Sequence, residues 1–153
     1  MTDRAEPVIR LRKMTGADAG DSLPLLSQLG CEMSREEAAT RVRDVAAAAG
    51  HALFVAEGDG QLVGLLHVFV RPAIENPREA VVQALVVGEK WRRQGVGRML
   101  MTAAECWGSE HECRSVVLDS SIARAPAHAF YQSLGYRVAA TAYVLRKPLA
   151  PPR

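Results

Sequence analysis

A valine-rich run, a glycine-containing bend and a helical pattern follow one another between residues 79 and 107. The run "EAVVQALVV" at 79–87 is short, apolar and rich in β-branched residues, which favours a strand buried on both faces. The bend "RRQGVGR" occupies 92–98, and behind it apolar side chains recur at helical spacing, at Val96, Leu100, Ala103, Ala104 and Trp107. A buried strand that turns into a helix indicates a mixed α/β domain with a central sheet.

The remaining segments extend this pattern of strands and helices. Ser34 and Glu37 are spaced as a capping box, at the start of a helix that ends before Gly50. Two apolar runs flank Gly58-Asp59-Gly60, which is a strong signal for a β-hairpin. The other predicted elements are a strand at 8–12, a first helix at 17–29, a strand from 115, a helix from Pro126 to Gly135, and a closing hairpin of strands 136–138 and 143–146.

The composition is that of one domain covering residues 1–153. Hydrophobic residues make up 48% and charged residues 24%, and a chain of 153 residues can bury a core without disulfides or a structural metal. The three cysteines form no CxxC pair, and no apolar run has the length of a secretory signal or a membrane span. We therefore expect a reduced, cytoplasmic protein without a metal site or a membrane partner.

The bend is a candidate anion site, because glycines let an anion approach the backbone and the start of a helix attracts negative charge. The common nucleotide motifs do not fit. "GVGRMLMT" lacks the lysine and hydroxyl of a P-loop, and Leu100 stands where a dinucleotide-binding motif has glycine. An ordinary tight turn and a solvated basic edge remain open as plainer interpretations. A nucleic-acid contact is less favoured, because the net charge is only +2.

Two motifs together resemble those of the GNAT N-acetyltransferase superfamily. "LVVGEKWRRQGVGRML" is similar to its acyl-coenzyme A loop, (Q/R)-x-x-G-x-(G/A), with Arg92, Gly95 and Gly97 in register. "ARAPAHAFYQSLGY" is similar to its later signature, A-x-x-(L/F)-Y with G-(F/Y) after a spacer, which is matched by Ala127, Phe130, Tyr131, Gly135 and Tyr136. The resemblance covers nearly the whole chain. It implies a mixed, mostly antiparallel central sheet with a splayed pair of parallel strands, flanked by about four helices.

Acetyl-CoA is the co-substrate that the resemblance implies. Its diphosphate would lie on the N–H groups of the bend, and its pantetheine arm along the backbone of the preceding strand. The implied binding residues are Leu85, Val86, Val87, Arg92, Arg93, Gln94, Gly95, Val96, Gly97, Arg98, Arg124, Ala127 and Tyr131. Arg124 departs from the family, because many members have asparagine there. A guanidinium at that place could reach a CoA phosphate or an acidic acceptor instead.

The implied reaction is direct attack of a primary amine on the thioester carbonyl. Tyr131 stands where the family has a tyrosine that donates a hydrogen bond or a proton to the leaving thiolate. The alternative for Tyr131 is a packing role beside Phe130. For the base that deprotonates the ammonium group, Glu79 and Asp119 are candidates, and a chain of water molecules is a third possibility.

The sequence therefore predicts an acetyl-CoA-dependent N-acetyltransferase that acts on a small-molecule or peptide amine. The alternative is a module that binds acyl-CoA without turnover, and the presence of Tyr131 argues against it. A third hypothesis is a nucleic-acid-binding domain that uses Arg92, Arg93 and Arg98, although we expect no nucleic-acid partner. The resemblance also implies that a homodimer could form through the C-terminal strands. The first two helices and the loop "RPAIENP" would select the acceptor, but they carry no motif that identifies it.

Overall fold

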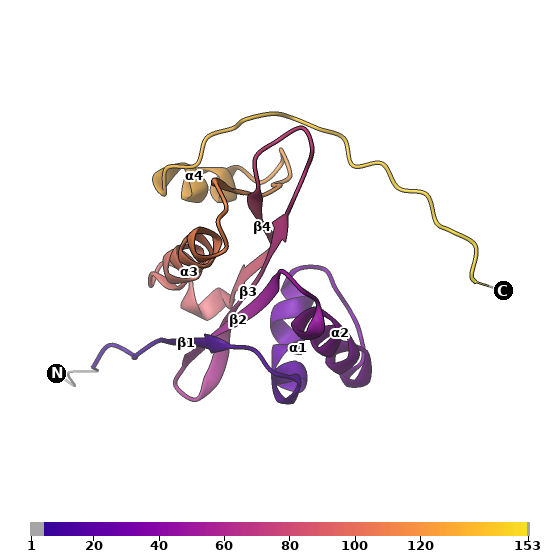
Figure 1. Ribbon diagram of the computed structural model, residues 1–153. Coiled ribbons are helices and arrows are strands. Elements are labelled where there is room, and N and C mark those ends of the chain that lie inside the picture. Colours follow the sequence, from indigo (N-terminus) through magenta and orange to yellow (C-terminus); the bar gives the residue numbers. More distant parts are fainter. Residues whose placement is uncertain (1–4, 153) are drawn as a thin grey trace. The chain divides into compact units, whose positions relative to one another are not determined.

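The computed structural model describes residues 5–152, among which a five-stranded sheet is central (Figure 1). Its strands lie in chain order, and neighbours are antiparallel except for β4 and β5, which are parallel. The bounds are β1 Arg10–Lys13, β2 His51–Gly58, β3 Gln61–Arg71, β4 Glu79–Val87 and β5 Ser115–Val117. The mixed, mostly antiparallel sheet expected from the sequence is confirmed.

Two helices cover one face of this sheet. They are α1 (Ala19–Gln28), which follows the 3-10 turn η1 (Gly16–Asp18), and α2 (Arg35–Ala47). Ser34 caps α2 as predicted, since its hydroxyl accepts a hydrogen bond from the N–H of Glu37 at 3.1 Å. The buried core on this face consists of Met14, Leu25, Val42, Leu53, Val55, Leu65 and Val86.

A third helix, α3 (Val96–Glu110), covers the opposite face and follows the short turn η2 (Glu89–Trp91). Gly64 of β3 permits its close approach, because a Cβ at Gly64 would lie only 2.9 Å from Leu100. Leu65 packs beneath α1 and α2, and successive side chains of a strand point to opposite faces, so α3 lies across the sheet from them. The buried residues of α3 that form this contact are Val96, Leu100, Met101, Ala104 and Trp107.

The chain divides into two compact units, residues 1–119 and residues 120–153. The second unit contains α4 (Ala125–Ser133), which has Pro126 in its first turn. Gly135 follows the helix with φ of +95°, a left-handed conformation that glycine adopts without strain, as the sequence predicted. Across residues 5–152, none of the helices is both long and apolar enough to cross a bilayer.

The predicted closing hairpin, strands 136–138 and 143–146, is wrong. Residues 136–152 hold no strand. Four of their large apolar side chains are 74–95% exposed, namely Val138, Tyr143, Val144 and Leu145. A two-stranded hairpin is marginal in water unless a sheet or an apolar face supports it. The first helix is also shorter than the predicted 17–29, because residues 16–18 form a 3-10 turn.

A charged cluster ties β1 to η1 and β2. The guanidinium of Arg12 donates to both carboxylate oxygens of Asp18, at 2.7 and 2.8 Å, and to Oε1 of Glu57 at 2.7 Å. Asp18 is only 7% exposed and also accepts the N–H of Thr15 at 2.8 Å. The hydrogen bonds from Arg12 lower the pKa of Asp18 from 3.8 to about 2, although burial opposes the shift.

We predict that Asp18→Asn lowers the free energy of unfolding by about 2 kcal/mol at neutral pH. Because the folded-state pKa is depressed, this stability is fully present above the unfolded pKa of 3.8 and is lost as the pH falls toward about 2. Urea unfolding of the wild type and the variant should therefore converge over that range. Glu37→Gln, in the exposed pair with Arg41, is the control and should change little. A loss from Asp18→Asn that does not vary with pH would contradict the assignment.

Candidate active site

One edge of β4 is left partly without a strand partner. Its ladder with β5 covers only Glu79–Val81, whereas β4 continues to Val87. On the other edge, the N–H of Gly88 donates to the C=O of Val63 at 2.8 Å. Alternate residues of an antiparallel strand point their polar groups to opposite edges, so those of Leu85 and Val87 face away from β3. The open edge can therefore offer main-chain donors and acceptors to a ligand.

A side chain from α1 reaches this open edge. The Nε2 of Gln28, the last residue of α1, donates a hydrogen bond to the C=O of Val87 at 3.2 Å. The bond holds the end of the helix beside the edge of β4. Gln28 was not predicted from the sequence, because nothing distinguishes a single glutamine near a helix end until the neighbouring strand is placed.

The glycine bend brings backbone N–H groups to the start of α3. Arg93 and Gly95 have left-handed backbone conformations, with φ of +62° and +82°, and such turns can direct successive N–H groups into an anion-binding concavity. Gly95 is the N-cap of α3 and no side chain caps it, which leaves N–H groups of the first turn open to a ligand. Val96 anchors the bend in the core, being 1% exposed. The exposed residues of the bend are Arg92, Arg93, Gln94, Gly95 and Arg98.

Tyr131 lies on α4 in the second unit, among aromatic neighbours. Its ring centre is 5.1 Å from that of Phe130 and 6.0 Å from that of Tyr136. Burial raises the pKa of Tyr131 above its usual 10.0, and the positive charge of Arg124 opposes the rise. The phenol is therefore protonated at neutral pH and able to donate a hydrogen bond.

Two further predicted residues lie at the start of the same helix. Arg124 is the N-cap of α4, its side chain is exposed, and its C=O accepts the N–H of His128 at 3.1 Å. Ala127 is half-buried in the first turn. The structure thus groups the predicted residues in two sets, Leu85–Val87 with Arg92–Arg98 in the first unit and Arg124, Ala127 and Tyr131 in the second.

The two candidate bases lie at different levels of the sheet, because Asp119 comes two residues after Val117, which pairs with Val81. Glu79 is the first residue of β4, about 20 Å along the strand from Leu85. Its Oε2 accepts a hydrogen bond from Nη2 of Arg71 at 2.8 Å, across the ladder with β3. Asp119 is exposed beyond the end of β5. Across residues 5–152, no three histidine, cysteine or acidic side chains gather as the ligands of a metal ion would.

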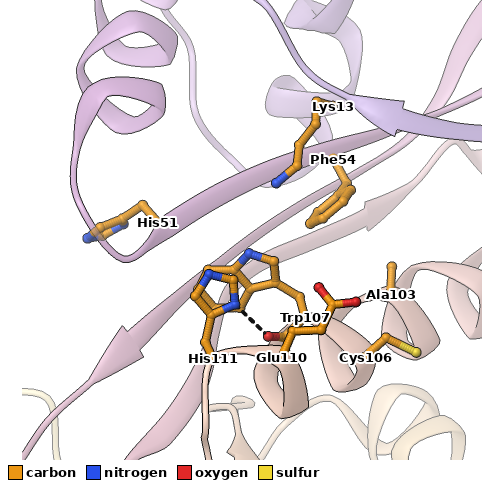
Figure 2. Close-up of a pocket in the computed structure, with 8 residues that line it drawn as sticks. All are labelled: Lys13, His51, Phe54, Ala103, Cys106, Trp107, Glu110 and His111. Carbon is orange, nitrogen blue, oxygen red and sulfur yellow. Dashed lines mark hydrogen bonds between the residues drawn. The ribbon is translucent and has the colours of Figure 1, made fainter.

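A hollow of about 480 Å³ lies between α3 and the first two strands (Figure 2). Its lining consists of Lys13, His51, Phe54, Ala103, Cys106, Trp107, Glu110 and His111. The ammonium of Lys13 already lies 4.4 Å from the ring centre of Phe54. The hollow adjoins the second half of α3, some 15 Å along the helix from the glycine bend. It is therefore separate from the open edge of β4.

Comparison with known proteins identifies the family. The Acetyltransferase (GNAT) family matches residues 24–136. The chain belongs to this family. An aminoglycoside N(6')-acetyltransferase type 1 from Stenotrophomonas maltophilia is 29% identical over 146 residues, which are 92% of this chain and 94% of the relative. The uncharacterized N-acetyltransferase YhdJ from Bacillus subtilis is 25% identical over 144 residues, which are 93% of this chain and 100% of the relative.

Solved structures confirm the GNAT fold. That of the aminoglycoside N-acetyltransferase AAC(6')-Iy in complex with CoA has a TM-score of 0.85 and 20% sequence identity, and the match covers 97% of this chain and 100% of that one. The protein is thus a GNAT N-acetyltransferase, as the two sequence motifs indicated.

We predict that Gln28→Leu weakens CoA binding roughly fivefold, because a positioned hydrogen bond contributes about 1 kcal/mol. The bond from Gln28 orders the C=O of Val87, and a carbonyl has a second lone pair for the ligand. Calorimetric titration with CoA measures the effect. Gln61→Leu is the matched control, because Gln61 is exposed at the start of β3. Unchanged or tighter binding by Gln28→Leu would show that the bond does not prepare the edge.

Proposed function

We propose that this GNAT enzyme transfers the acetyl group of acetyl-CoA directly to a primary amine of a small molecule. The observation that carries the proposal is that one strand has an open edge, at Leu85 and Val87, and is followed in the chain by the glycine bend at the start of α3. Main-chain groups of the edge suit the amides of pantetheine, and the N–H groups of the bend suit a diphosphate. The family membership supports the same assignment.

A polyamine of the aminoglycoside type is the first acceptor to test. The supporting observation is that relatives from Stenotrophomonas maltophilia and Serratia marcescens are aminoglycoside N(6')-acetyltransferases, the latter 26% identical over 132 residues. A peptide amine is the alternative acceptor. We place the protein in the cytoplasm, where acetyl-CoA is available as co-substrate.

The chemistry requires two proton transfers. The acceptor ammonium must lose a proton before its nitrogen attacks the thioester carbon, and the departing sulfur must gain a proton or a strong hydrogen bond. We assign the second task to Tyr131, whose raised pKa keeps the phenol protonated. Arg124, at the start of the same helix, would contact a phosphate of CoA or an acidic part of the acceptor. Glu79 remains a candidate base, acting through water because of its place at the far end of β4.

Release of thiol from acetyl-CoA is the decisive measurement. The panel of acceptors should include aminoglycosides, linear polyamines, amino acid amides and short peptides. An enzyme of the proposed kind releases thiol only when a matching amine is present. A chain that binds CoA but releases no thiol with any acceptor would instead be a sensor of acyl-CoA.

We predict that Tyr131→Phe lowers kcat by 10²-fold to 10⁴-fold, the usual contribution of a general acid. The ring that packs beside Phe130 remains, so the fold and the affinity for CoA should barely change. Single-turnover acetyl transfer at saturating acetyl-CoA measures the chemical step. Tyr143→Phe is the matched control, since Tyr143 is 95% exposed. A loss of less than about threefold in Tyr131→Phe would remove Tyr131 from the acid role.

We also propose that two copies associate through residues 136–152. These residues are extended and leave Tyr143, Val144, Leu145 and Leu149 exposed by 78–95%. Soluble monomers rarely present such a run of apolar residues to water. An extended apolar segment can instead add to a sheet edge of another copy, where main-chain hydrogen bonds and side-chain burial both contribute.

The expected outcome is a concentration-dependent dimer. Light scattering after size-exclusion chromatography should give twice the chain mass for the full protein and the chain mass for a form truncated after Gly135. The double variant Val144→Asp, Leu145→Asp should likewise be monomeric, because charges oppose burial of the segment. A full-length chain that stays monomeric at all accessible concentrations would exclude this association.

A further inference from the structure

Two histidines and a phenylalanine form a cluster on β2 and β3. The Nδ1 of His51 lies 2.9 Å from Nε2 of His67, so one of these nitrogens carries the hydrogen that joins the rings. The ring of His51 also stacks on Phe69, with 5.0 Å between the centres and 14° between the planes. The contact with His51 therefore fixes the orientation of the His67 ring, and stacking on Phe69 fixes that of His51. None of these residues stood out in the sequence.

The strand register places this cluster beside the point where β4 and β5 separate. His67 pairs with Ala84 and Phe69 with Val81, and Val81 is the last residue of β4 paired with β5. Val68 pairs with Val82, so Gln83 is an extra residue of β4 opposite this cluster. The open edge begins at the same level of the sheet. Only the width of β4, about 4.8 Å between neighbouring strands, separates the cluster from that edge.

The imidazole of His67 points to the face of the sheet that α1 and α2 cover. Side chains two residues apart share a face, and Leu65 packs in the core beneath these helices. Gln28 of α1 reaches the edge of β4 at Val87, which borders the same region. An acceptor held over β4 on this face could present its nitrogen to the thioester, with one water molecule between that nitrogen and His67.

His67 is uncharged at neutral pH and would hold a proton only briefly before passing it on. Burial lowers the pKa of His67 to about 4, and the nearby charge of His51 adds to the effect. The ring is therefore neutral at neutral pH and has a lone pair to offer. Glu79 is paired with Arg71 at the start of β4, and Asp119, two residues beyond the last paired residue of β5, has an exposed side chain.

We propose that His67 is the proton acceptor for the amine substrate, working through a water molecule and relayed to solvent by His51. The inference rests on the proposed acetyl transfer. Before the attack, the ammonium gives one proton through water to His67. As the amine nitrogen then bonds to the carbonyl carbon and the C–S bond breaks, the nitrogen loses a second proton, which replaces the one that Tyr131 gives to the sulfur. The thiolate takes a proton from Tyr131. The net change is one ammonium and one thioester converted to one amide, one thiol and one released proton.

His51 provides the exit for that proton. It is half-buried and lines the hollow beside α3, whereas His67 does not (Figure 2). In the figure His51 stands at the start of its strand, apart from the other lining side chains. A proton received by His67 can therefore pass along the 2.9 Å contact and leave through His51.

Removal and chemical replacement of the imidazole test the proposal. His67→Ala should lower kcat about 10²-fold with CoA affinity unchanged, and free imidazole should restore part of the rate. His67→Gln, which keeps a polar side chain near His51, should be equally slow and should not respond to imidazole. His111→Gln is the matched control, because His111 lies at the C-terminal end of α3. It should behave as the wild type with and without imidazole.

The outcomes separate the inference from the function on which it rests. If the wild type binds CoA but transfers no acetyl group to any acceptor, the proposed function fails and the inference fails with it. If the wild type is active, a rate within threefold of it for His67→Gln shows that His67 only fills space. Absence of imidazole rescue in a His67→Ala variant that binds CoA normally would also overturn the assignment.

Discussion

The pairing of β4 with β5 ends after Val81, and the rest of the site depends on this early end. A strand that stops pairing leaves main-chain groups that must find another partner or stay solvated. In the proposed function these groups bind the amides of the pantetheine arm. The short ladder is sufficient to place β5, while six further residues of β4, 82–87, remain available on that edge. The proposed binding surface is thus a segment of β4 that has no strand partner on this edge.

The position of α3 places a second group of backbone N–H donors, those of the glycine bend, after the open edge of β4. Gly64 brings the start of the helix close to β3, and Val96 and Leu100 fill the space that a larger side chain would need. The glycine bend must therefore lie directly beyond the end of β4. Its left-handed residues, Arg93 and Gly95, reverse the chain within a few residues. A ligand with a diphosphate joined to an amide-containing arm matches this order of features.

Features that depend on residues close together in the chain were predicted from the sequence. Features that depend on the pairing of distant strands were not. The hairpin at residues 58–60, the cap at Ser34 and the bounds 79–87 of β4 all follow from neighbouring residues. The glycine bend was found for the same reason. The closing hairpin was wrong because its stability depends on a partner surface elsewhere. Gln28 and His67 were missed because their neighbours on β4 are fixed by strand register and by the extra residue Gln83.

The hollow beside α3 is a cavity lined by side chains, and it does not coincide with the proposed cofactor site. It is lined by side chains of β1, β2 and α3, whereas the open edge of β4 offers backbone groups. Backbone groups are present whatever the side chains are, so the cofactor track tolerates wide changes of sequence. In the proposed function, selection of the acceptor would then rest on side chains outside this backbone track.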